Sequence, residues 1–192
     1  MAAVSSTMQA LGSSVPSFGL PDVARENSIV TTTDMNGRPL LIMFICNHCP
    51  FVVHILEEMV ELANQAVAKG FGVSAISSND QQAYPQDGPL AMAELASKHA
   101  FNFPYLFDES QEVAKAFGAA CTPDFFVYDA QHRLQYRGQM DDSRPGNGRP
   151  VNGHDLSLAI ENILAGKAAI DDQKPSIGCS IKWRSGNAPD YS

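Results

Sequence analysis

The 192-residue sequence is poor in basic residues and in long apolar runs. It has 13 Lys and Arg residues against 21 Asp and Glu residues, which gives a net charge of −8. This charge disfavours nucleic acid and anionic lipid as partners, because both are bound through clustered positive charge. The longest apolar run, Leu40 to Cys46, is far shorter than the roughly 20 residues that span a bilayer. We therefore expect neither a nucleic-acid partner nor a membrane partner.

The sequence also lacks an export signal and a disulfide scaffold. Its first twenty residues contain no basic region followed by a continuous apolar region, so we expect a cytoplasmic protein. Structural disulfides would be reduced in the cytosol, and the cysteines are too few and too scattered for a scaffold. Any disulfide is therefore expected to be transient and chemical. The four cysteines are Cys46, Cys49, Cys121 and Cys179.

What is present is enough apolar material for one domain, since 44% of the residues are hydrophobic. Residues 1–21 are rich in small polar residues, Gly and Pro, and we expect them to form an N-terminal arm over the surface. Residues 22–167 carry the periodic segments of an α/β domain. Residues 168–192 have no clear period and are expected to form a tail packed on the domain.

The periodic segments alternate between strands and helices. Residues 28–33 are β-branched, and Asn-Gly at 36–37 predicts a tight hairpin turn into a strand over residues 40–45. That second strand is apolar throughout, as expected when both of its faces are covered. The later segments predict helices near 50–69, 90–99, 109–117 and 154–165, and strands near 71–77, 103–108, 124–129 and 133–138. This order favours a three-layer α/β/α domain with a central mixed sheet, helices on both faces and an extra N-terminal hairpin, the organisation of a thioredoxin-like domain.

Two cysteines three positions apart, Cys46 and Cys49, fall at the junction between the strand at 40–45 and the next helix. Free N–H groups and the dipole at a helix N-terminus stabilise a thiolate, so we expect Cys46 to have a lowered pKa and to act as the nucleophile. Cys49, one turn deeper, is expected to attack the mixed disulfide that Cys46 forms. Asn47 and His48 lie between them, and His48 either tunes the Cys46 thiolate or is a solvated loop histidine.

A metal site is the competing interpretation of this pair. Cys46, Cys49 and either His48 or His54 could bind zinc, but a structural zinc site needs four ligands and usually a second closely spaced pair. The sequence has no second pair of that kind. We therefore predict redox chemistry with no metal and no bound cofactor.

Three segments together resemble a known group: "FICNHCPFV", "FPYLFDESQEVAKAFGAACTPDFFVYD" and "LQYRG". They are similar to the thioredoxin-fold superfamily, and most to the thiol-disulfide oxidoreductases that border the AhpC/TSA (peroxiredoxin) family, over residues 28–166. The resemblance implies a cis bond between Thr122 and Pro123 that faces the cysteine pair and positions the substrate. It also implies an open backbone edge there, against which an extended substrate segment pairs. The ending "IGCSIKWRSGNAP" is similar to a subgroup described as thioredoxin or thiol-disulfide isomerase.

Departures from these patterns keep alternatives open. Typical thioredoxins carry a buried acid in the strand before the pair, but residues 40–45 contain none, so the proton acceptor for Cys49 is not identified. Peroxiredoxins carry Thr three residues before their reactive cysteine, where this sequence has Cys46, and no partner Arg can be assigned. A thiol peroxidase that uses Cys49, with Cys46 resolving its sulfenic acid, is thus the weaker alternative. A redox-sensing or binding module without turnover is the third.

The remaining candidates carry less chemistry. If Pro123 faces the pair, Cys121 is a candidate third thiol, although an inert buried cysteine is the favoured interpretation. Cys179 matches the subgroup ending without a chemical role, and Trp183 is expected to be a packing anchor. Residues 144–153 predict a flexible loop beside the site. The leading hypothesis is disulfide exchange with protein or small-molecule thiols and disulfides, with the direction of electron flow and the oligomeric state left open.

Overall fold

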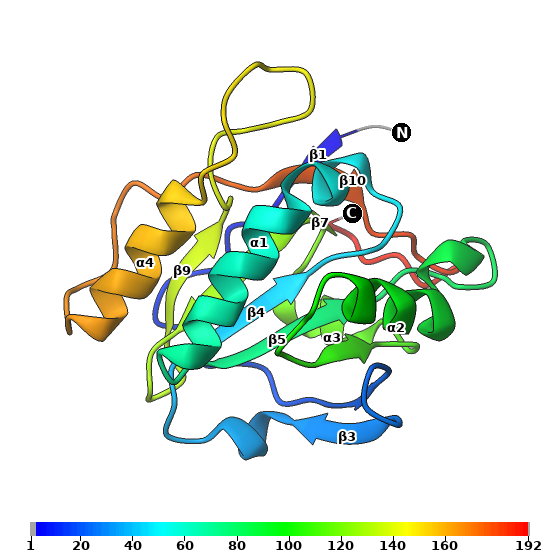
Figure 1. Cartoon of the computed structure of the whole chain (residues 1–192), viewed down its shortest axis with the longest axis horizontal. Helices are drawn as coiled ribbons and strands as arrows, with labels where there is room; N and C mark the ends of the chain where they lie inside the picture. The colour runs from blue at the N-terminus through cyan, green and yellow to red at the C-terminus, as the bar shows by residue number, and fades with distance from the viewer. Residues whose placement is uncertain (1–2, 192) are drawn as a thin grey trace.

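A seven-stranded mixed sheet forms the centre of the protein in the computed structural model, which describes residues 3–191 (Figure 1). The central strands β4, β5 and β6 are parallel, and the outer pairs are antiparallel. In spatial order the strands are β3 (Ser28–Thr31), β2 (Gly19–Asp22), β6 (Tyr105–Phe107), β5 (Gly72–Ser77), β4 (Leu40–Phe44), β8 (Asp124–Tyr128) and β9 (Leu134–Gly138).

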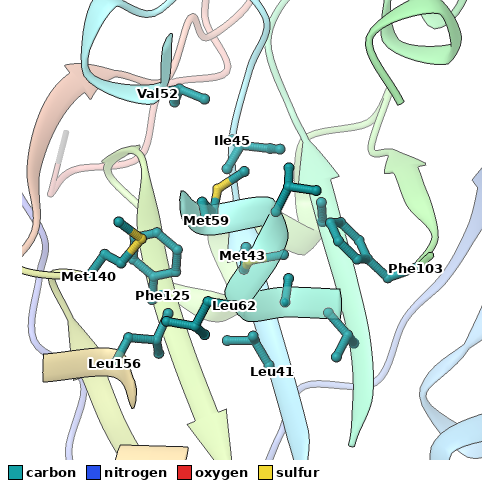
Figure 2. Close-up of a cluster of buried hydrophobic side chains, with 14 of the residues drawn as sticks. Leu41, Met43, Ile45, Val52, Met59, Leu62, Phe103, Phe125, Met140 and Leu156 are labelled. Atoms are coloured by element: carbon teal, nitrogen blue, oxygen red, sulfur yellow. The ribbon is translucent and has the colours of Figure 1, made fainter. Parts of the chain in front are cut away.

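Helices cover both faces of this sheet and create two apolar cores. Helices α1 (Pro50–Ala68), α2 (Pro89–Lys98) and α4 (His154–Leu164) pack on one face, and α3 (Glu112–Phe117) packs on the other. Leu41 and Met43 of β4 point toward Met59 and Leu62 of α1 in the first core (Figure 2). Leu40, Ile42 and Phe44 face the second core. β4 is apolar at every position because both of its faces are buried, and the predicted three-layer fold is confirmed.

The N-terminal hairpin exists, but its predicted partners are wrong. β3 pairs antiparallel with β2, not with β4, whose two edges are occupied by β5 and β8. The chain turns out of β3 at a capping box, in which Thr31 and Asp34 bond each other's backbone N–H groups and begin the 3-10 helix η1 (Thr32–Met35). The Asn36-Gly37 turn therefore follows a short helix and leads the chain back toward the centre of the sheet.

A second, three-stranded sheet joins the two ends of the chain. It contains β1 (Ala3–Ser5), β10 (Ile177–Ser180) and β7 (Cys121–Thr122), with β10 in the middle and both pairings antiparallel. Sequence periodicity did not predict this sheet, because β1 and β7 are very short. The division into arm, domain and tail stays a prediction, and its residues 1, 2 and 192 lie outside the described part.

Two other predicted segments have defined surroundings. The loop at residues 144–153 projects from the end of the molecule that holds β1 and β10 (Figure 1). The carboxylate of Asp141 holds it, accepting hydrogen bonds from the backbone N–H groups of Asn152 and Gly153. Trp183 packs against the second core, as predicted. Within residues 3–191, no helix combines the length and the apolar character needed to cross a membrane.

Candidate active site

Cys46 and Cys49 lie together where β4 ends and α1 begins. Cys49 is the N-cap residue of α1, and Pro50 occupies the first helical position, where its missing N–H costs nothing. Both cysteines are buried, with exposed fractions of 1% for Cys46 and 0% for Cys49. Their thiols lie close enough for each to shift the pKa of the other. Of the residues next to them in sequence, Asn47 and His48 are partly exposed and Pro50 is exposed.

The predicted partner dipeptide lies against this pair. The bond between Thr122 and Pro123 is cis, as the resemblance implies. The Thr122 hydroxyl Oγ1 is 3.3 Å from Cys46 Sγ, and the Thr122 carbonyl oxygen is 3.1 Å from Cys49 Sγ. Thr122 thus contacts both sulfur atoms from a strand that is more than 70 residues away in sequence.

A buried carboxylate that the sequence analysis missed organises the loop between the cysteines. Asp87, at the end of the 3-10 helix η2 (Pro85–Asp87), is fully buried. Its carboxylate accepts hydrogen bonds from the backbone N–H of Asn47 at 2.8 Å and of His48 at 3.2 Å. It also pairs with His48 Nδ1 at 2.5 Å and accepts from Asn79 Nδ2 at 2.8 Å. The N–H groups of this loop therefore point to Asp87 and not to the Cys46 sulfur.

The side chains of Asn47 and His48 also hold the loop in place. The His48 ring stacks on Tyr84, with 5.3 Å between ring centroids and 7° between ring planes. Asn47 Oδ1 accepts a hydrogen bond from the Tyr105 hydroxyl at 3.0 Å. Burial raises the pKa of Tyr105, so this hydroxyl stays protonated and remains a donor. The predicted tuning by Asn47 and His48 would therefore act through loop geometry and through Asp87.

The pKa values of the two thiols are shifted in opposite directions. The hydrogen bond from the Cys46 thiol lowers the pKa of Cys49 to about 5, assisted by the Cys179 thiol and the backbone N–H groups of Val52 and Cys179. Donating that bond raises the pKa of Cys46, and burial and the negative charge of Asp87 raise it further. The sequence analysis expected the lowered pKa on Cys46. It was wrong because Cys49, not Cys46, occupies the helix N-cap and collects the donors.

The other two cysteines have different surroundings. Cys179 on β10 is hydrogen-bonded through its side chain to Cys49, and it is buried, with 4% of its surface exposed. Burial and this bond raise the pKa of Cys179 to about 12. Cys121 Sγ donates instead to the Pro123 carbonyl at 3.7 Å, and burial raises the pKa of its thiol. The thiol next to Cys49, apart from Cys46, is therefore Cys179, to which the sequence analysis assigned no chemistry.

Three metal-binding groups are close together at this site. A ligand atom from each of Cys46, His48 and Asp87 lies within 4.8 Å of the other two. The Asp87 carboxylate is already saturated by four protein groups, and a structural zinc site needs four ligands. This cluster is therefore better explained as the network that fixes the Cys46 loop.

An acid and an arginine were the two groups that the sequence analysis could not assign. One of the buried acids is Asp124, which follows Pro123 on β8 and pairs in register with Phe44 of β4. Burial raises the pKa of Asp124 well above its usual range. Among residues 3–191, no arginine side chain forms a hydrogen bond with Cys46 or Cys49.

Comparisons with known proteins identify the family and the fold of this chain. The model of the AhpC/TSA family matches residues 11–137. An uncharacterized conserved protein from Geobacillus kaustophilus is 49% identical, with a TM-score of 0.93 over 96% of this chain and 97% of that chain. A hypothetical protein from Sinorhizobium meliloti is 45% identical, with a TM-score of 0.91 over 95% of this chain and 99% of that one.

More distant similarity extends to the fold alone. A secreted disulfide oxidoreductase from Mycobacterium tuberculosis is 17% identical, with a TM-score of 0.58 over 75% of this chain and 94% of that chain. Among curated proteins, no sequence matches this one. The resemblance on which the fold was predicted is confirmed, because the family model covers more than half of the sequence and the structural neighbours share the thioredoxin-like fold. The chain belongs to the AhpC/TSA family.

Proposed function

We propose that the protein is a thiol-disulfide oxidoreductase that exchanges disulfides with protein or small-molecule partners through Cys46 and Cys49. The observation that carries this proposal is a pair of buried, interacting thiols, with one residue, Thr122, in contact with both sulfur atoms. Two thiols in contact can interconvert with a disulfide without large movement of the backbone.

The reduced pair shares one proton, and its transfer activates the nucleophile. Cys46 passes its proton to the Cys49 thiolate along their hydrogen bond, and the Cys46 thiolate attacks the substrate disulfide. One substrate thiolate leaves as the bond between Cys46 and the other substrate sulfur forms. Cys49, protonated at this stage, can donate to the Thr122 carbonyl 3.1 Å away.

The second step closes the disulfide of the enzyme. With Cys46 in the mixed disulfide, the Cys179 thiol and the N–H groups of Val52 and Cys179 remain to stabilise a thiolate on Cys49. Cys49 attacks Cys46 Sγ, and the bond between Cys46 and the second substrate sulfur breaks. That sulfur takes the proton of Cys49 and leaves as a thiol, and a Cys46–Cys49 disulfide remains. No cofactor takes part in either step. The opposite direction of electron flow reverses both steps.

The test is turnover of a model protein disulfide by the wild-type protein and by serine variants. Cys46→Ser is expected to abolish turnover, and Cys49→Ser is expected to stop at a mixed disulfide on Cys46 that mass spectrometry detects. Cys121→Ser is the matched control and should keep turnover, because Cys121 is bonded to the Pro123 carbonyl. Full turnover by Cys46→Ser would refute the mechanism. Reversible oxidation of the pair without turnover would favour a redox-sensing module instead.

A thiol peroxidase is the second candidate, favoured by the lowered pKa of Cys49, about 5, at the N-cap of α1. Here the Cys49 thiolate would attack peroxide, and Cys46 would resolve the sulfenic acid. The distinguishing measurement is hydrogen peroxide consumption, which should disappear in Cys49→Ser but begin normally in Cys46→Ser. Disulfide exchange is the stronger proposal, because no arginine within residues 3–191 bonds to either thiol to orient a peroxide.

A further inference from the structure

The family resemblance implied an open backbone edge beside Thr122 and Pro123. In the structure this edge is occupied, because β10 of the same chain pairs with it. Cys179 lies opposite Thr122 in register, and Ser180 lies opposite Cys121. β1 pairs with the other edge of β10. β10 therefore takes the position in which an extended substrate segment would pair, and it brings a cysteine to that position.

The register of β10 places Cys179 against the reactive pair. Its partner Thr122 has its carbonyl oxygen 3.1 Å from Cys49 Sγ and its hydroxyl 3.3 Å from Cys46 Sγ. The thiol and the backbone N–H of Cys179 lower the pKa of Cys49, and Cys49 raises the pKa of Cys179, so the two residues lie within interaction distance of each other. Cys49 thus has two neighbouring thiols, Cys46 and Cys179.

A glycine makes this close approach of β10 sterically feasible. A Cβ atom on Gly178 would lie 2.1 Å from the Thr122 carbonyl oxygen and 3.1 Å from the Pro123 nitrogen. Only a residue without a side chain can bring the strand so close to the Thr122–Pro123 peptide.

Hydrogen bonds fix β10 at both ends. At its start, the carbonyl oxygen of the buried Ser176 accepts a hydrogen bond from the Ser6 N–H at 3.0 Å. The hydroxyl of Ser176 donates to the Gly138 carbonyl at 2.7 Å. Beyond its end, Lys182 N–H donates to Asn79 Oδ1 at 2.8 Å, and the amide of the same Asn79 donates to Asp87. The network that holds the Cys46 loop therefore also holds the strand of Cys179.

We propose that Cys179 is a second resolving thiol, which exchanges with the Cys46–Cys49 disulfide to form a Cys49–Cys179 disulfide. This inference rests on the proposed function. Cys179 Sγ attacks Cys49 Sγ, the bond between Cys46 and Cys49 breaks, and Cys46 leaves with the proton that Cys179 loses. The number of disulfides does not change, so the step needs no further oxidant. Its product has a free Cys46 thiol and a covalent bond between β10 and the start of α1.

The test is disulfide mapping of the full-length protein after equilibration with oxidised glutathione, which supplies the oxidising equivalent. Trypsin places Cys46 and Cys49 in the peptide 26–69 and Cys179 in the peptide 168–182, because Arg38 and Lys174 each precede a proline. A Cys49–Cys179 disulfide joins these two peptides, whereas a Cys46–Cys49 disulfide stays within the first. We expect both forms in the wild-type protein.

The decisive variant is Cys46→Ser, in which Cys49 has only Cys179 as a bonded thiol. We expect this variant to form the Cys49–Cys179 disulfide, seen as the cross-linked peptide and as the loss of the mass of two hydrogen atoms. The control, Cys121→Ser, should behave like the wild type. Cys179→Ser should lose the cross-link and keep the Cys46–Cys49 disulfide. A Cys46→Ser protein that keeps both thiols free, or carries only a glutathione adduct, overturns the inference, as does a wild type without the cross-link. The absence of any disulfide in the wild type would instead overturn the proposed function, and the inference with it.

Discussion

Asp87 sets the charge beside the Cys46 and Cys49 thiols, so replacing it with asparagine should change the reduction potential of the pair. The carboxylate is fully buried, and its ligand atom lies within 4.8 Å of Cys46 Sγ. The asparagine side chain has nearly the same shape. Its oxygen can still accept the N–H groups of Asn47 and His48, and its amide can donate to His48 Nδ1, so the loop should keep its backbone bonds; the Asn79 amide loses its acceptor.

The magnitude follows from the distance between the two charges. Two unit charges about 5 Å apart interact by roughly 3.5 kcal/mol at an effective dielectric constant of about 20. Removing the carboxylate charge stabilises the reduced pair by up to this amount, the limit being a thiolate on Cys46, whose pKa Asp87 raises, and leaves the uncharged disulfide almost unaffected. Because about 30 mV corresponds to 1.4 kcal/mol for a two-electron couple, the potential should become more oxidising by up to about 75 mV.

The assay is equilibration of the reduced and oxidised protein in glutathione buffers, followed by alkylation and mass spectrometry. Asp80→Asn is the matched control. It changes a carboxylate in the same loop, and its Oδ1 caps the Gln82 N–H at 3.0 Å. This control should leave the potential nearly unchanged. An Asp87→Asn potential that is unchanged, or more reducing than that of the wild type, would refute the electrostatic role of Asp87.

Three further predictions concern the same site. Thr122→Val removes the hydroxyl that lowers the pKa of Cys46, so kcat/KM for a model disulfide should fall roughly tenfold, the equivalent of about 1.4 kcal/mol, in steady-state assays. Gly178→Ala should lower the free energy of unfolding by about 1–3 kcal/mol in denaturant titrations, whereas Gly19→Ala, whose Cβ would meet nothing closer than 3.5 Å, should cost less. Folding lowers the pKa of Cys49 to about 5, so the reduced wild type should gain stability over Cys49→Ala as the pH rises from about 5 to 8.5, and this gain should be lost as the pH falls toward 5. Melting temperatures of the two proteins that run parallel over that pH range would contradict this sign.

Local sequence signals were sufficient for the main elements of the fold. The apolar run at residues 40–45 and the helical period from Pro50 onward correctly predicted β4 and α1 and the position of the cysteine pair between them. The prediction that Thr122-Pro123 lies beside that junction depended on a family resemblance, because no local sequence pattern indicates which distant strands are neighbours. The misassigned hairpin has the same origin, since the Asn-Gly signal says nothing of which edges of β4 are free.

The parts of the site that were missed are all non-local. Asp87 reaches the loop of Cys46 from a 3-10 helix about 40 residues later, and nothing in its own neighbourhood signals a buried carboxylate. Cys179 reaches Cys49 through a strand that pairs with only two residues of β7. One signal for Cys179 was available, namely a glycine directly before a cysteine in an otherwise aperiodic tail. Its meaning becomes clear only when Gly178 is seen against the Thr122 carbonyl.

The central claim, disulfide exchange through Cys46 and Cys49, is tested most directly by comparing the rates at which a model protein disulfide and hydrogen peroxide oxidise the reduced protein. The proposed function predicts that, at equal concentration, the protein disulfide reacts faster and that Cys46→Ser abolishes this reaction. Faster oxidation by hydrogen peroxide, with a sulfenic acid forming on Cys49 at an unchanged rate in Cys46→Ser, would contradict it.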